Sequence, residues 1–247
     1  MGKEVAGGGC TADDFERFRR RLEEETRHAQ AAYFRGAFAN DALVAGFELE
    51  AWLIGSDLLP VPRNVSFLAR LDSPLVVPEL SRFNVELNGT AQPLHGNALS
   101  RLESELTATW QECQRVAAAD DGALIAIGTL PTLREEDLSL SNMSPARRYA
   151  VLNEQIFRLR GGSPLSLNIA GIDNLATTHS DVMLEAATTS FQVHLQVPAG
   201  EAARANNASQ ILAAPLVALA ANSPFLFGRA LWHETRVPLF EQAVDCC

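Results

Sequence analysis

The sequence predicts an α+β fold, in which a mainly antiparallel or mixed curved sheet is backed by helices. Three short segments alternate apolar and polar residues, which is the pattern of a strand with one buried face. Between them lie longer segments whose apolar residues recur every three or four positions, as in amphipathic helices. Strands with one polar face favour an antiparallel or mixed sheet, because strands of a doubly wound parallel sheet are apolar on both faces.

The N-terminal stretch divides into a tail and a helix. Residues 1–10 are Gly-rich and are predicted to be disordered. Residues 11–36 are predicted to form a long helix, because Thr11 can cap its start and Gly36 can end it. No linker-like segment interrupts the rest of the chain, so residues 11–247 are expected to form a single domain.

The later elements follow from periodicity and from the positions of Gly and Pro. The segment "GALIAIGTL" is apolar throughout, which suits a strand buried on both faces. Ser144 and Pro145 are expected to start a helix, and Pro215 to kink another. Strands are predicted over 42–54, 82–88, 122–130 and 189–198, helices over 97–119, 144–160 and 200–224, and a proline-rich loop over 56–78.

Composition and charge limit the class of protein. The chain has 247 residues and a net charge of −10, which argues against a general binder of nucleic acid or of anionic membranes. It has no apolar run of the ~20 residues that a membrane helix needs, and no signal-peptide pattern at its start, so a cytoplasmic location is expected. The four cysteines form no CxxC pair, which favours reduced thiols over a zinc site or a disulfide framework.

The polar faces of the three alternating strands carry the residues that suggest chemistry. Their opposite faces are expected to enter the core: Phe47, Leu49, Ala51 and Leu53 of the first strand, Phe83, Val85 and Leu87 of the second, and Phe191, Val193, Leu195 and Val197 of the third. The polar faces comprise Glu48 and Glu50, then Asn84, Glu86 and Asn88, then Gln192, His194 and Gln196. These side chains include no Lys and no Arg.

Two interpretations of the polar faces remain open. An antiparallel sheet with one solvated face shows the same alternation without any function. Carboxylates, amides and imidazole are, however, the groups that bind hard or borderline metal ions. Glu48 and Glu50 lie roughly 6.6 Å apart along one face of a strand, and such like charges repel unless a cation is near. A pair of magnesium ions would relieve this repulsion, with Glu48 and Glu50 each holding a different ion. Glu79, seven residues before Glu86, makes a fourth acid that could converge with them on one cavity.

Six segments, in order, resemble the glutamate–cysteine ligase type 2 family, which includes plant and proteobacterial enzymes and the carboxylate–amine ligases. "GFELEAWLIG" resembles the G-x-E-x-E strand of the family, and "PELSRFNVELN" its second acidic strand. "AIGTLPT" is similar to a G-T/H-x-P turn, and "NMSPARRYAVLNEQI" to an M-P-x-x-R-Y helix start. "MLEAATTSFQVHLQVP" resembles the ligand-bearing third strand, and "PLVALAANSPFLFGR" an A-N-S-P-F-x-x-G segment. Together they span roughly residues 40–240.

The resemblance implies a glutamine-synthetase-like catalytic domain and a role for each matching residue. Glu48, Glu50, Glu79 and Glu86 fall on metal-binding acids, and Gln192 completes a metal site. His194 falls on a position that contacts the cofactor, and Arg236 resembles an arginine near the substrate and the phosphates, so it is assigned both catalytic and cofactor-binding roles. Arg148 and Tyr149 match the R-Y pair and are expected to be structural.

The activity that the resemblance implies is an ATP- and magnesium-dependent ligation. The γ-carboxylate of glutamate would form an acyl phosphate, and the amine of cysteine would displace the phosphate in the first step of glutathione synthesis. The implied partners are small molecules, with a homo-oligomer left open. A carboxylate–amine ligase with another amine, a non-catalytic member that only binds or oligomerises, and a magnesium phosphotransferase are the alternatives.

Two departures from the family pattern bear on these expectations. Glu185 and Ala186 stand where the plant-type enzymes have Arg-Thr, which changes part of the expected substrate contact. The chain also stops at "AVDCC", so it is expected to lack the C-terminal segment of the family.

Overall fold

The computed structural model describes residue 4, residues 10–38 and residues 43–245 of the chain. Its centre is an antiparallel sheet, which confirms the predicted α+β class. β1 pairs with β3, β4, β5 and β8, and β2 pairs with β3. Within the described ranges the sheet contains six strands: β1 (Val44–Gly55), β2 (Val76–Pro78), β3 (Asn84–Asn88), β4 (Gln92–Pro93), β5 (Gly122–Ile125) and β8 (Phe191–Gln196).

The register places the three predicted polar faces side by side. Glu48 of β1 is the partner of Asn88 on β3 and also of Gln192 on β8. Glu50 is directly opposite Glu86. Residues opposite one another in adjacent strands point to the same face of a sheet, so the ligand-type side chains of the three strands share one face.

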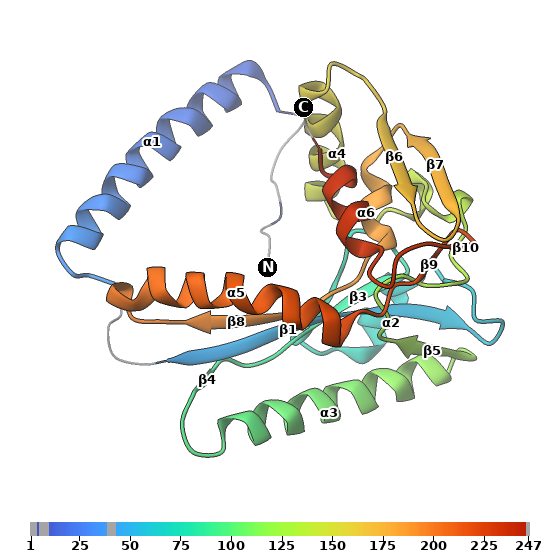
Figure 1. Cartoon of the computed structure of the whole chain (residues 1–247), viewed down its shortest axis with the longest axis horizontal. Coiled ribbons are helices and arrows are strands. Elements are labelled where there is room, and N and C mark those ends of the chain that lie inside the picture. Colours follow the sequence, from blue (N-terminus) through green and yellow to red (C-terminus); the bar gives the residue numbers. More distant parts are fainter. Residues whose placement is uncertain (1–3, 5–9, 39–42, 246–247) are drawn as a thin grey trace.

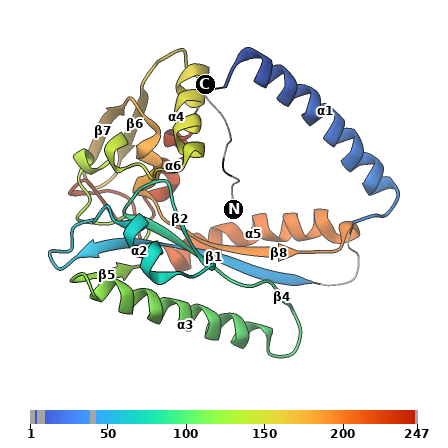
Figure 2. The same cartoon turned by 180° about the vertical axis from the view of Figure 1, so that it is seen from behind.

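Two helices cover the other face of the sheet, α2 (Asn64–Leu71) and α3 (Ala98–Ala118) (Figure 1, Figure 2). Ala51, Leu53, Val85 and Leu87 are at most 1% exposed and pack against apolar side chains of these helices, which confirms the predicted core face of β1 and β3. Cys113 of α3 lies fully buried in this cluster, and burial raises the pKa of its thiol to about 12. It is therefore a small core residue, as predicted.

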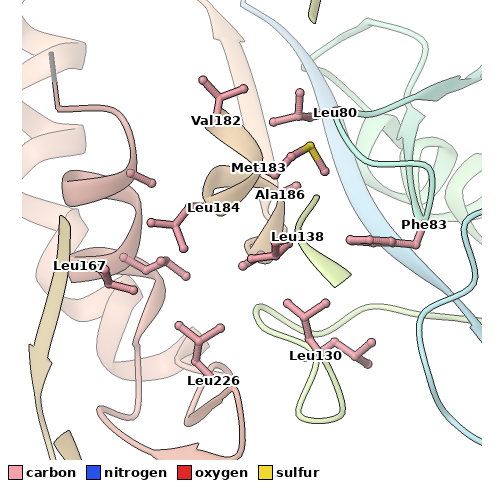
Figure 3. Packing of buried hydrophobic residues seen from close by; sticks show 14 of the residues in the cluster. Leu80, Phe83, Leu130, Leu138, Leu167, Val182, Met183, Leu184, Ala186 and Leu226 are labelled. Carbon is pink, nitrogen blue, oxygen red and sulfur yellow. The ribbon is translucent and has the colours of Figure 1, made fainter. Parts of the chain in front are cut away.

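A second apolar cluster joins the sheet to the later part of the chain (Figure 3). Trp52 and Phe83 stack here with ring centroids 5.5 Å apart. The prediction that Phe83 shares the face of Val85 and Leu87 is wrong, because β3 begins only at Asn84 and strict alternation does not extend back to Phe83. Figure 3 labels Leu80, Phe83, Leu130, Leu138, Leu167, Val182, Met183, Leu184, Ala186 and Leu226 of this cluster.

The part of the molecule beyond the sheet consists of short elements, most of which the sequence patterns did not predict. Leu165, Leu167 and Ile169 alternate with exposed residues, so β6 buries one face in the second cluster. The elements are α4 (Arg147–Leu159), the hairpins β6 (Leu165–Ala170) with β7 (Asn174–His179) and β9 (Phe225–Leu226) with β10 (Arg229–Ala230), α6 (Arg236–Ala243), and the 3-10 turns η1 (Glu135–Asp137), η2 (Leu140–Asn142), η3 (Val182–Ala187) and η4 (Ala199–Glu201).

Two boundaries differ from the predictions. The apolar run at 122–130 forms strand only as far as Ile125, because the segment after it turns away to contact residues 222–225. Helix α4 begins at Arg147 with Ala146 as its N-cap, and not at Ser144 and Pro145. The hydroxyl of Ser144 instead donates to the backbone oxygen of Glu79 and accepts from the amide of Asn64.

Helix α1 (Ala12–Phe34) confirms the predicted N-terminal helix. Thr11 caps it, with reciprocal hydrogen bonds to Asp14. None of its residues is buried, and Figure 1 shows it standing away from the sheet. The predicted disorder of residues 1–10 falls almost wholly outside the described residues, as do Cys246 and Cys247.

The prediction for the apolar face of the third strand is wrong. Every residue of β8 is exposed, including Phe191, Val193 and Leu195. These side chains lie on the same face of the sheet as Phe47, and the ring centroids of Phe47 and Phe191 are 5.9 Å apart. They are exposed because α2 and α3 pack only against the neighbouring strands. Helix α5 (Ala202–Ala220) runs along the opposite face of β8 and also has no buried residue (Figure 1). No helix of the described chain is long and apolar enough to cross a membrane.

Candidate functional site

A cavity of about 650 Å³ opens on the polar face of the sheet. The sheet side contributes Glu50, Asn84 and Gln192, and Glu79 lies just after β2. The facing walls come from η3, α5 and α6. The strands therefore position polar groups at one side, and three later elements enclose them.

Two of the four predicted metal-binding acids, Glu50 and Glu79, line this cavity, and a third, Glu86, lies next to them. Glu50 and Glu86 are cross-strand partners, and the carboxyl group of Glu79 is close enough to share a hydrogen bond with Glu86. Burial, followed by the charges of Glu50 and Glu86, raises the pKa of Glu79 to about 8. The repulsion among these three neighbouring carboxylates is thus relieved partly by a proton on Glu79.

Glu50 is the best-anchored member of this acid cluster, which consists of Glu50, Glu79 and Glu86. Its carboxylate accepts hydrogen bonds from the Ser190 N–H (2.8 Å), the Ser190 hydroxyl (3.0 Å) and the Gln192 amide (3.4 Å). Burial raises the pKa of Glu50 and the charge of Glu86 adds to the rise, while the hydrogen bonds from Ser190 and Gln192 oppose it. Gln192, which is predicted to complete a metal site, thus lies beside one of the predicted metal-binding acids.

The acid cluster matches magnesium in donor chemistry. Hard anionic oxygens are the ligands that this ion prefers. Within the described part of the chain, no group of three or more His, Cys, Asp or Glu side chains already has the arrangement of a metal site, so a bound ion would have to draw these carboxylates together. Glu86 is only 7% exposed, which removes the plain solvated face as an explanation for this pair of acids.

Glu48 and His194 lie apart from the acid cluster, in a second hollow of about 400 Å³. The imidazole Nε2 of His194 is 3.6 Å from a carboxylate oxygen of Glu48. Asn88 lines the same hollow and donates a 2.7 Å hydrogen bond to Glu86. The four acids therefore do not converge on one cavity as predicted: Glu48 lies in the second hollow, and Glu50 and Glu79 line the first, on the same face of the sheet.

Arg236 lines the main cavity at the start of α6, where its guanidinium group is held on three sides. It donates to both carboxylate oxygens of Glu234, one of them at 3.0 Å, and to the backbone oxygen of Thr189 at 2.8 Å. Burial opposes ionisation of Glu234, but Arg236, Ser223 and the Asn222 N–H outweigh it and lower its pKa. The arginine is thus fixed next to the segment that leads into β8.

Gly128 of the "AIGTLPT" motif makes room for this arginine. A Cβ atom at position 128 would lie 2.6 Å from Nε of Arg236 and 2.6 Å from the side-chain oxygen of Asn222. The same Asn222 oxygen accepts a hydrogen bond from the Gly128 N–H. Two segments that the sequence analysis singled out separately therefore meet around Arg236.

The structural expectation for Arg148 and Tyr149 agrees with their contacts. Arg148 donates to the Tyr149 hydroxyl, which in turn donates to the backbone oxygen of Pro78 next to Glu79. Tyr149 is only 8% exposed, and burial raises its pKa to about 12. The pair supports the chain at the edge of the cavity rather than entering it.

Sequence reasoning missed Glu234 and Ser190 as site residues. The sequence places Glu234 two residues before Arg236. That spacing indicates an ion pair only if the backbone turns between the two residues, and the sequence pattern did not show this turn. Ser190 could be expected from its position just before the third strand, opposite Glu50. Glu185 was noted only as a departure from the family, yet it lines the cavity from η3.

Comparison with known proteins agrees with this arrangement. A family model described as glutamate-cysteine ligase family 2 matches residues 44–246, which include the sheet, the cavity walls and every predicted site residue. No curated protein matches the chain. Because the match covers most of the chain, the chain belongs to glutamate-cysteine ligase family 2, a family of ATP-dependent ligases.

Proposed function

We propose that this chain is an ATP- and magnesium-dependent ligase that joins the γ-carboxylate of glutamate to an amine. The observation that carries the proposal is the acid cluster: Glu50 and Glu79 line the main cavity, the buried Glu86 lies beside them, and the chain belongs to this family. Carboxylates that lie close together away from water are unfavourable when no cation is near. A bound ligand with positive charge would explain why they lie together at this cavity.

The position of each residue in the two hollows indicates the role that it would have in the reaction. Glu50, Glu79 and Glu86, with Gln192, would hold magnesium, which supplies charge neutralisation for the phosphates of ATP. Arg236 is held by Glu234 and Thr189 at the cavity wall, where it can stabilise negative charge on a substrate. Glu48 and His194 line the adjoining hollow, where they would contact the nucleotide or a further ion.

The test is magnesium-dependent release of ADP by the purified chain, first with glutamate alone and then with glutamate and an amine. Replacing Glu50 by Gln removes a ligand charge but keeps the size of the side chain and one acceptor oxygen, so we expect ADP release to fall by about 100-fold or more. The matched control is Glu103→Gln, an exposed acid on α3 away from the cavity.

Each outcome points to one alternative. Amine-dependent ADP release that Glu50→Gln abolishes supports the ligase. Stabilisation by magnesium and ATP without ADP release would instead favour a binding member of the family. Transfer of phosphate to a stable product without an amide would favour a phosphotransferase.

A further inference from the structure

Glu185 is a charged residue in the main cavity that the acid cluster and the arginine do not use. It lies in η3 and lines the cavity. In the described part of the chain its carboxylate has no hydrogen bond and no ion pair. Burial alone raises its pKa, with no contribution from a neighbouring charge, so it stands apart from Glu50 and Glu79.

The other charges of the cavity are already committed. Glu50 and Glu79 interact with each other and with Glu86. Among the described lining residues, Arg236 is the single cation, and its donors go to Glu234 and to Thr189. Because Glu234 neutralises the charge of Arg236, a ligand carboxylate near Glu185 would meet a like charge with no net positive neighbour to offset it.

The rest of the cavity wall restricts the body of the ligand. Leu216 and Val217 of α5 and Phe240 of α6 line it. A pocket with apolar walls and one unpaired carboxylate suits a molecule with an alkyl or aryl body and one cationic group.

We propose that Glu185 is a specificity-determining residue that selects, as the acceptor of the ligation, a cationic amine with an apolar body over a zwitterionic amino acid such as cysteine. This inference rests on the proposed function for the identity of the reaction, but not for the binding of the amine. The ammonium group would pair with Glu185, while the glutamate and phosphate groups belong beside the acid cluster.

The experiment is a calorimetric titration of the full chain at pH 8 with hexylamine, hexanoate and cysteine, without ATP or magnesium. We expect hexylamine to bind at least about 10-fold more tightly than either other probe. Glu185→Gln should remove that preference, and Glu185→Asp should retain part of it. Glu241→Gln, an exposed acid on α6, is the matched control and should bind hexylamine as the wild type does.

Equal binding of hexylamine by the wild type and Glu185→Gln, with both folded by thermal denaturation, would overturn the inference. Tighter binding of cysteine than of hexylamine would overturn it as well. The proposed function fails separately, as an absence of ADP release with every amine, because the titration requires no turnover.

Discussion

At the scale of single residues, the main feature is a set of carboxylates held close together against their mutual repulsion. The effect of this repulsion and of burial is largest at Glu79, whose pKa is raised to about 8 from an ordinary 4.5. A carboxyl whose pKa is higher in the folded state stabilises the fold below its ordinary pKa, and this contribution is lost as the pH rises through the folded value.

We therefore expect the magnesium-free chain to lose stability between about pH 4.5 and pH 8, and Glu79→Gln to lose less. At pH 8 the variant should be more stable than the wild type by about 1–2 kcal/mol, or roughly 2–8 °C in Tm. Urea unfolding from pH 5 to pH 8 in EDTA measures this. Added magnesium should stabilise the wild type but not the variant, and a wild-type stability that is flat with pH would contradict the argument.

A substitution at Arg236 can separate a role of this residue in catalysis from a role in stabilising the fold. Lys at this position keeps the charge but loses the paired hydrogen bonds to Glu234, so Arg236→Lys should lower kcat by about 10- to 100-fold. Arg204→Lys on the exposed surface of α5 is the control. If the arginine only supports the fold, Tm would fall in the variant while kcat at a permissive temperature stayed close to that of the wild type.

At the scale of elements, β1 is the organising strand. Its twelve residues pair with four other strands, and its alternation separates a core face, packed on α2 and α3, from the face that carries the acids. β8 continues the acidic face but has no helix beneath its apolar side. The same alternation in sequence therefore has different burial in different strands.

This difference predicts unequal costs for one substitution. Val85→Ala on β3 removes a side chain that is 0% exposed and should cost about 2 kcal/mol of unfolding free energy. Val193→Ala on β8 removes one that is 71% exposed and should cost less than about 0.5 kcal/mol. Urea denaturation of both variants measures the difference, and equal costs would mean that another surface covers β8 in solution.

At the scale of the whole molecule, charge predicts which form of the proposed nucleotide would bind. The net charge of −10 and the acidic cavity both repel an anion. We expect free ATP to bind at least about 10-fold more weakly than ATP with magnesium, because cations at the acid cluster would reverse the local potential. Titration of each form at fixed ionic strength tests this; the Glu50→Gln and Glu79→Gln double variant should reduce the difference.

The sequence by itself determined the α+β class, the alternating faces of β1 and β3, the capped helix α1 and the buried thiol of Cys113, because each depends on a local period or a local cap. It also determined the family through ordered motifs.

Only the tertiary structure decided which acids meet. Strand register and the turn after β2 bring Glu50, Glu79 and Glu86 together and leave Glu48 beside His194, and no local pattern contains that register. The burial of each strand also depends on the tertiary structure, because β8 has the alternation of a core strand but, within the described residues, α2 and α3 do not cover its apolar side. Local periodicity shows which face of an element is apolar, whereas contacts between distant segments decide whether that face is covered and which charges share a cavity.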